Sequence, residues 1–396
     1  MALFKGNIQV SRIFNMPAFS KWRVLQFFAS HPNAGSSVSG LSLPKNSNNF
    51  EGIQGLRFIA ALLVVITHST FYATERLGAG GDIWARGVCG VDIFFVISGF
   101  VMVASTMRTW GRDDAWKNFA LRRLIRIVPM YWLATTAKLS TFLISPAAIL
   151  HSHPTILHIV SSYLFIPTTN SEGEYAPLLG VGWTLDYEMF FYALFALALF
   201  AKKNVFAYLG AILSVASVAS IFCTPGLPAI TMYANSIVLE FFFGMLIAGL
   251  LHKSNYRLPL WASVSLVLAG GALLFAPYHN MPHVGPRVLA DGLPAALLVL
   301  GVVALEPQLK GRIPRLVILF GDASYVLYLF HPLIAPIAPE FLRKLGIHIF
   351  SLSILLSISL ALCVTALIHL SIERYATNQL KKLFFSRPVS TAAATV

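Results

Sequence analysis

Charged residues and cysteine are both scarce in this sequence. Asp, Glu, Lys and Arg make up only 11% of the 396 residues, whereas hydrophobic residues make up 57%. The mean hydropathy of +0.72 excludes a soluble globular domain and predicts a protein that crosses the membrane several times. The three cysteines, Cys89, Cys223 and Cys363, lie far apart without the spacing of a metal or redox motif. Neither a disulfide framework nor a metal site is therefore expected.

The apolar runs predict an all-α fold, a membrane helix bundle of about ten transmembrane helices. A helix needs about 20 apolar residues to cross the hydrocarbon core. The runs near that length are 54–73, 87–106, 127–146, 179–201, 204–222, 231–251, 258–276, 288–305, 316–338 and 347–370. We expect a membrane domain over residues 51–375 and a cytosolic tail over residues 376–396. Residues 1–50 are mixed and lack the features of a signal peptide, so we expect a cytosolic, partly disordered extension.

The basic residues are distributed unevenly between the two sides of this predicted topology. The net charge is +13, and with ten spans 22 of the 29 Lys and Arg residues fall on the side of the N-terminus. Because cytosolic loops carry the excess of Lys and Arg, both termini are expected in the cytosol. The positive charge is thus explained by membrane orientation, and no nucleic-acid partner is expected.

The first apolar window contains two ionisable residues, Arg57 and His68. Eleven residues separate them, so on a helix they lie about 20° apart around the axis and roughly 16 Å apart along it. Both side chains therefore point into one groove at two depths. Ionisable residues inside a spanning helix usually face the bundle interior and mark a functional site.

Counting residues from the membrane surface predicts a layer of titratable groups near the outer side. His68, Asp92 and His331 lie about 8–9 Å from that side, and Glu188 lies about 14 Å from it. A carboxylate beside a histidine fixes its tautomer and stabilises the imidazolium, as a general base requires. Glu188 is the preferred partner of His68, and Glu240 is the competing candidate.

A cluster of arginines is expected on the cytosolic side, formed by Arg57, Arg123 and Arg126. Arg123 and Arg126 are three residues apart and share one face of a helix. Guanidinium groups suit phosphate, although ordinary cytosolic anchoring is an equal alternative for the neighbouring Arg122. Acyl-CoA fits this arrangement, since its phosphates would meet the arginines while its thioester reaches His68.

Five sequence motifs in a fixed order resemble the acyltransferase-3 family, over about residues 50–375. The motifs are Gly55-Leu-Arg57 with His68, Gly90-Val-Asp92-Ile-Phe-Phe-Val-Ile-Ser98-Gly99, Arg122-Arg-Leu-Ile-Arg126-Ile-Val-Pro129-Met-Tyr-Trp132, Trp183-Thr-Leu-Asp-Tyr-Glu188, and Ser324-Tyr325-Val-Leu-Tyr328-Leu-Phe-His331-Pro332. The family consists of bacterial inner-membrane enzymes that acylate, most often acetylate, sugar hydroxyls of surface and exported glycans. The resemblance implies acyl-CoA as the donor. The SGNH hydrolase-like domain that some members carry is not expected here.

The resemblance implies that His68 is the central catalytic residue. We expect it to take the proton of a sugar hydroxyl while Glu188 or Asp92 orients it. In a rival route His68 carries the acyl group covalently. Aromatic and histidine side chains near the outer layer are candidates for binding the sugar, although most aromatic residues there also suit an interfacial belt. These candidates are Trp183, Tyr325, Tyr328 and His331.

The expected partners are therefore the lipid bilayer and a glycan or lipid-linked sugar acceptor, with glycan-export machinery as a further candidate. Two other functions remain open. A proton-coupled secondary transporter or glycolipid flippase would also use intramembrane His, Asp and Glu residues. Such transporters usually show repeated halves, and this sequence has no convincing repeat. An inactive membrane scaffold is disfavoured by the intact set of motifs.

Overall fold

The computed structural model describes residues 50–77, 80–145, 154–170, 173, 175–223, 228–253, 258–276 and 287–385. These residues are almost entirely helical, and the strand-like pairing found among them is an isolated bridge between Thr169 and Tyr175. The predicted all-α fold is thus confirmed. The predicted N-terminal extension lies outside the described residues, except for Phe50. The first part of the predicted tail belongs to helix α16 (Arg374–Phe385).

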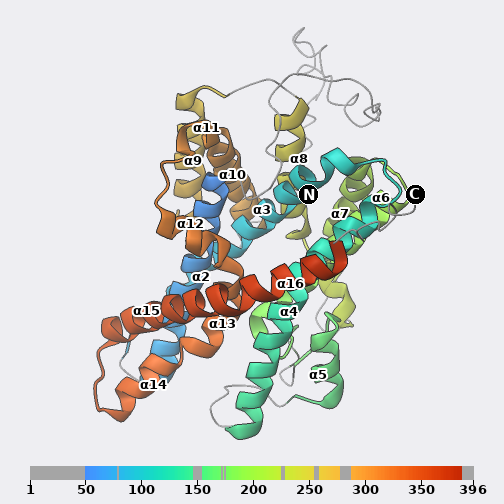
Figure 1. Cartoon of the computed structure of the whole chain (residues 1–396). Helices are drawn as coiled ribbons and strands as arrows, with labels where there is room; N and C mark the ends of the chain where they lie inside the picture. The colour runs from blue at the N-terminus through green and yellow to red at the C-terminus, as the bar shows by residue number, and fades with distance from the viewer. Residues whose placement is uncertain are drawn as a thin grey trace, which may run out of the picture. The chain divides into compact units, whose positions relative to one another are not determined.

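Eight helical segments in the described part of the chain are long and apolar enough to cross a membrane. They contain α2 (Glu51–Leu77), α3 (Cys89–Thr106), α4 (Ala115–Ile144), α6 (Trp183–Phe200), α7 (Val205–Ala219), α8 (Val238–Lys253), α13 (Ser324–Ile334) with α14 (Ile337–Lys344), and α15 (Phe350–Ile368) with α16 (Figure 1). Two shorter apolar helices, α9 (Leu260–Leu274) and α10 (Leu293–Ala304), bring the apolar elements to the predicted ten. The short helices α5 (Ile156–Tyr163), α11 (Glu306–Leu309) and α12 (Arg315–Asp322) connect them.

The ninth predicted window is wrong in one respect, because the chain breaks inside it. Residues 316–322 belong to α12, which ends at Asp322, and a new helix, α13, begins at Ser324. Helix α12 packs against α2 so closely that a Cβ atom on Gly321 would lie 2.3 Å from the backbone oxygen of Gln54. An apolar run does not distinguish a short packed helix from the start of a span, so this break could not be predicted from hydropathy.

Glycines hold α2, α3 and α8 at close range. A Cβ atom on Gly90 of α3 would lie 2.2 Å from the backbone oxygen of Ala60 in α2. Where α3 meets α8, a Cβ atom on Gly99 or on Gly244 would lie 1.9 Å from a backbone oxygen of the other helix. Small residues allow such close contact between membrane helices. These contacts fix α3 against α2, which carries Arg57 and His68.

We expect Gly244→Ala to destabilise the protein by about 1–3 kcal/mol, because the added methyl group overlaps the backbone of α3 and forces the helices apart. Thermal unfolding of the purified protein in detergent measures this effect. Gly271→Ala on α9 is the matched control, since a Cβ atom there meets nothing within 4 Å. An equal melting temperature for Gly244→Ala and wild type would contradict the close packing of α3 on α8.

Helices α15 and α16 form one long element that crosses in front of α2 and α4 (Figure 1). A π-helical turn over His369–Glu373 joins them, and α15 contacts α2 while α16 contacts α4. The Arg122 guanidinium lies over the ring of Phe385, 4.5 Å from its centroid. Arg122 therefore packs between α4 and α16, apart from the two arginines that follow it on α4.

Candidate active site

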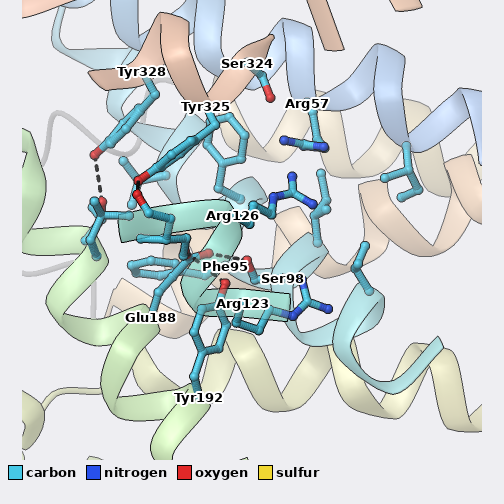
Figure 2. Close-up of a pocket in the computed structure, with 18 of the residues that line it drawn as sticks. Arg57, Phe95, Ser98, Arg123, Arg126, Glu188, Tyr192, Ser324, Tyr325 and Tyr328 are labelled. Atoms are coloured by element: carbon cyan, nitrogen blue, oxygen red, sulfur yellow. Dashed lines mark hydrogen bonds between the residues drawn. The ribbon is translucent and has the colours of Figure 1, made fainter. Parts of the chain in front are cut away.

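The arginine cavity lies among α2, α3, α4, α6 and α13, and its empty volume of about 860 Å³ includes space that is open to solvent. Figure 2 shows its labelled side chains, which come from all five helices. The polar residues of its wall are Gln54, Arg57, Ser98, Arg123, Arg126, Thr184, Glu188, Tyr192, Ser324, Tyr325 and Tyr328. Three segments that are far apart in the sequence thus bring three arginine side chains and one glutamate into the same space.

The three arginines of this cavity have no carboxylate partner within 4.0 Å among the described residues. The Arg57 Nη1 atom donates to Gln54 Oε1 at 3.2 Å, and the Arg123 Nη2 atom donates to Ser105 Oγ at 3.0 Å. The Arg123 guanidinium also lies 5.7 Å from the ring centroid of Tyr192. Unneutralised guanidinium groups around one cavity form a site suited to phosphate or another anion.

Glu188 lies in the arginine cavity, and its predicted contact with His68 is wrong. Its carboxylate accepts hydrogen bonds from the hydroxyl groups of Ser98 and Tyr192, the latter at 3.1 Å (Figure 2). Ser98 lies six residues further along α3 than Asp92, or about 9 Å deeper. Counting from the window edge had therefore placed Glu188 too close to the outer layer. The carboxylate organises the wall of the arginine cavity.

The histidine cavity adjoins the arginine cavity, and its empty volume of about 1190 Å³ includes space that is open to solvent. Its wall contains His68 and Tyr72 from α2 and Lys138 from α4. It also contains Arg287, which directly precedes the π-helical turn Val288–Gly292 that leads into α10. His68 Nδ1 lies 3.0 Å from the backbone oxygen of Val64. Because a carbonyl oxygen only accepts, this contact assigns the proton to Nδ1 and leaves Nε2 with a free lone pair. His68 therefore has the tautomer required of a general base.

The titratable neighbour of His68 is His331, not a carboxylate. The two ring centroids are 4.8 Å apart, with the planes at 65°. His331 is fully buried, and its Nδ1 atom lies 3.2 Å from the backbone oxygen of Leu327. Its Nε2 atom has no hydrogen-bond partner among the described residues. The predicted layer thus does bring the histidines of α2 and α13 together.

The carboxylate of Asp92 binds Arg287 and not His68, so the predicted contact between Asp92 and His68 is absent among the described residues and its catalytic role stays a prediction. Its fully buried carboxylate accepts two hydrogen bonds at 2.8 Å, from Nε and Nη2 of Arg287. Glu240, the competing candidate, is also fully buried and lies beside Gly292 rather than in either cavity wall. The predicted distance from the membrane surface did not show toward which neighbouring helix each of these side chains points.

Arg287 was not among the predicted site residues, because it lies just before the predicted span 288–305 and so outside the membrane windows. A signal was present, since a carboxylate inside a membrane helix requires a cationic partner. Asp92 was placed in the membrane without one. Arg287 lies at the outer end of a predicted span, at a depth that matches Asp92 near the start of α3.

The two cavities share two wall residues, Val91 and Tyr328. The Tyr328 hydroxyl donates to the backbone oxygen of Val181 at 3.1 Å and accepts from Thr184 Oγ1 at 3.0 Å. These bonds fix the ring at the junction. Arg57 and His68 lie on opposite sides of this junction, roughly 16 Å apart along α2.

The remaining predicted sugar-binding residues are divided between the cavities. Trp183 lines the histidine cavity, and Tyr325 lines the arginine cavity. The Tyr325 hydroxyl donates to the backbone oxygen of Ile127 at 2.8 Å, so it holds α13 against α4. His331 lies behind His68 and does not contribute to either cavity wall.

The fold and the two adjoining cavities define a multi-pass helical membrane protein with an internal site. The described helices place three arginines in one cavity and His68 in the cavity that adjoins it. The chain belongs to the acyltransferase-3 family, because the acyltransferase domain that defines this family matches residues 50–370. It is an O-acyltransferase, and the predicted enzyme class is confirmed.

Three similar proteins extend this assignment. The chain is 36% identical over 269 residues to the exopolysaccharide production protein ExoZ of Rhizobium meliloti (strain 1021), covering 66% of this chain and 80% of that protein. It is 28% identical over 159 residues to the putative peptidoglycan O-acetyltransferase YrhL of Bacillus subtilis (strain 168), covering 37% and 23%. It is 32% identical over 84 residues to the peptidoglycan O-acetyltransferase OatA of Listeria monocytogenes, covering 20% and 12%. No solved structure matches the chain.

Proposed function

We propose that this enzyme transfers an acetyl group from acetyl-CoA to a hydroxyl group of an exported or surface polysaccharide. The observation that carries the proposal is the junction at Val91 and Tyr328, which joins an anion-binding cavity to a cavity that contains a free histidine base. The similar proteins support acetyl as the group and a polysaccharide as the acceptor, since their names refer to exopolysaccharide production and to O-acetylation of peptidoglycan.

The arginine cavity is the proposed site for the phosphates of acetyl-CoA. Arg57, Arg123 and Arg126 lack carboxylate partners among the described residues, so phosphate oxygens would neutralise them. The excess of Lys and Arg on the N-terminal side supports a cytosolic position for this cavity. Both termini then lie in the cytosol of a bacterial cell, and the enzyme resides in the inner membrane.

The histidine cavity is the proposed site of the chemistry. His68 Nε2 accepts the proton of the sugar hydroxyl, and the hydroxyl oxygen forms a bond to the thioester carbonyl carbon. The carbon–sulfur bond then breaks, and the CoA thiolate receives the proton from His68. The products are the sugar ester and free CoA. The ring of His331 packs against the ring of His68 at a steep angle, and this contact would hold the orientation that carboxylates were predicted to provide.

Membranes that contain the enzyme, supplied with acetyl-CoA labelled on the acetyl group, test the proposal. We expect label in chloroform-insoluble glycan, with release of one CoA for each acetyl group transferred. Membranes without the enzyme provide the background. Absence of labelled glycan with every exopolysaccharide and peptidoglycan acceptor supplied would refute the assigned acceptor class.

Val91→Phe tests the junction between the cavities. Val91 is 6% exposed and lines both cavities, so a larger ring fills the passage without adding charge. We expect transfer to fall by roughly 5–150-fold, which corresponds to the cost of about 1–3 kcal/mol for overpacking a filled space. Binding of acetyl-CoA, measured by calorimetry on the purified protein, should remain within twofold of wild type. Val91→Ala is the control that keeps the passage open, and equal transfer rates for the two variants would contradict the path.

A further inference from the structure

The histidine cavity is lined by cationic side chains without an acidic one among the described residues. Two residues of its wall are cationic, Lys138 and Arg287, and no Asp or Glu is among the described residues that line it. The arginine cavity differs, because Glu188 forms part of its wall. If the histidine cavity holds the acceptor, as the proposed function requires, this charge restricts which acceptors fit.

Arg287 is an oriented donor in this cavity. Its Nε and Nη2 atoms bind Asp92, which is fully buried, while 35% of the Arg287 side chain is exposed. The carboxylate therefore lies behind the guanidinium and holds it toward the cavity. The Nη1 atom makes no hydrogen bond to a described residue, so its donors face a potential ligand. Asp92 neutralises the charge of Arg287, so Arg287 adds no net positive charge to the cavity. Its contribution is an oriented hydrogen-bond donor.

Lys138 supplies the uncompensated charge. It lies on α4, twelve residues after Arg126 and so about 18 Å further along the helix. Its amine forms no hydrogen bond or ion pair with any described residue. A lysine without a counterion is costly inside a membrane, and lysines in spans usually face a cavity or an ionic partner. Lys138 faces the histidine cavity, where a bound anion would supply that partner.

We propose that the acceptor glycan is acidic, and that Lys138 and Arg287 together bind its anionic group. This binding places a neighbouring hydroxyl group against His68 Nε2. The anion is either a carboxylate on a sugar, as in a uronic acid, or the phosphate of a lipid diphosphate that carries the sugar. Both present the oxygen atoms that an ammonium and a guanidinium group recognise.

The test compares kcat/KM for a glucuronate-containing oligosaccharide with that for the same oligosaccharide after chemical reduction of its carboxyl group. We expect wild type to prefer the acidic form by at least about tenfold, as one charge-assisted hydrogen bond provides. Lys138→Met should reduce this ratio to near one, and Lys138→Arg should restore most of it. Lys117→Met, on the same helix outside both cavities, is the control and should keep the wild-type ratio.

A second pair of acceptors separates the two sources of the anion. The reduced oligosaccharide is supplied either free or linked to a polyprenyl diphosphate. A preference for the linked form that disappears in Lys138→Met assigns the site to the lipid phosphate, whereas a preference confined to the glucuronate form assigns it to the sugar. Added salt should weaken either preference.

Equal kcat/KM values for all three acceptors, unchanged in Lys138→Met, would overturn this inference while leaving the transferase function intact. Absence of transfer by wild type to every acceptor would instead contradict the proposed function. In that case the affinity of the purified protein for the glucuronate oligosaccharide, carrying an added fluorescent label, still decides the inference. Tighter binding by wild type than by Lys138→Met supports it, and equal affinity overturns it.

Discussion

Replacing His68 by alanine is expected to lower acetyl transfer by about 10²–10⁴-fold, because the attacking hydroxyl loses its general base. His68 lines the cavity assigned to the acceptor, and its Nε2 atom is free to accept a proton. Its side chain is not part of the arginine cavity, so acetyl-CoA binding should persist. Initial rates of label transfer, measured with equal amounts of purified protein, provide the comparison.

His252→Ala is the control for this experiment, because His252 is exposed on α8 and lines neither cavity. Its activity should equal that of wild type. Transfer by His68→Ala at more than one tenth of the wild-type rate would remove His68 from the chemistry. Label bound to His68 of wild-type protein in the absence of acceptor would instead establish the covalent route.

Arg126→Gln is expected to raise the KM for acetyl-CoA by about 10–150-fold, the range that corresponds to losing one hydrogen bond to a charged group. Arg57→Gln should act in the same direction, since both guanidinium groups lie in the arginine cavity without a carboxylate partner (Figure 2). The kcat at saturating donor should change less than KM, because neither side chain lies in the histidine cavity. Steady-state kinetics over a range of acetyl-CoA concentrations separates the two constants.

Arg122→Gln is the matched control, since Arg122 is exposed and packs on Phe385. Its KM for acetyl-CoA should remain within twofold of wild type. A donor that lacks the 3′-phosphate shows which arginine binds this phosphate. With that donor, replacing the arginine in question should raise KM least, because the contact is already missing. Equal KM increases for Arg122→Gln and Arg126→Gln would show a general effect of surface charge and contradict a specific phosphate site.

The number and type of the helices follow from the sequence, since apolar length is a direct consequence of crossing hydrocarbon. Two details do not. Helices α9 and α10 are shorter than a full span, and the break between Asp322 and Ser324 is invisible in hydropathy. Both depend on how neighbouring helices pack, as the close approach of Gly321 to α2 illustrates.

The candidate site could be predicted where two residues share one helix. Arg57 and His68 lie on one face of α2 by helical periodicity alone, and the structure places them in two adjoining cavities. Pairing between helices requires rotation as well as depth, which a single sequence does not supply. Depth in the membrane therefore did not reveal the partners of the two carboxylates. Glu188 binds Ser98, and Asp92 binds Arg287.

The central claim is that donor and acceptor reach the enzyme from opposite sides of the membrane. Purified enzyme in sealed liposomes tests this claim most directly. Acetyl-CoA and the glycan acceptor are placed either on opposite sides of the bilayer or together on one side. Because reconstituted enzyme inserts in both orientations, opposite placement always supplies some correctly oriented molecules. We predict transfer with opposite placement and none with the same placement, and no transfer by His68→Ala in either arrangement. Transfer only when donor and acceptor share one side would contradict a path through the junction at Val91 and Tyr328.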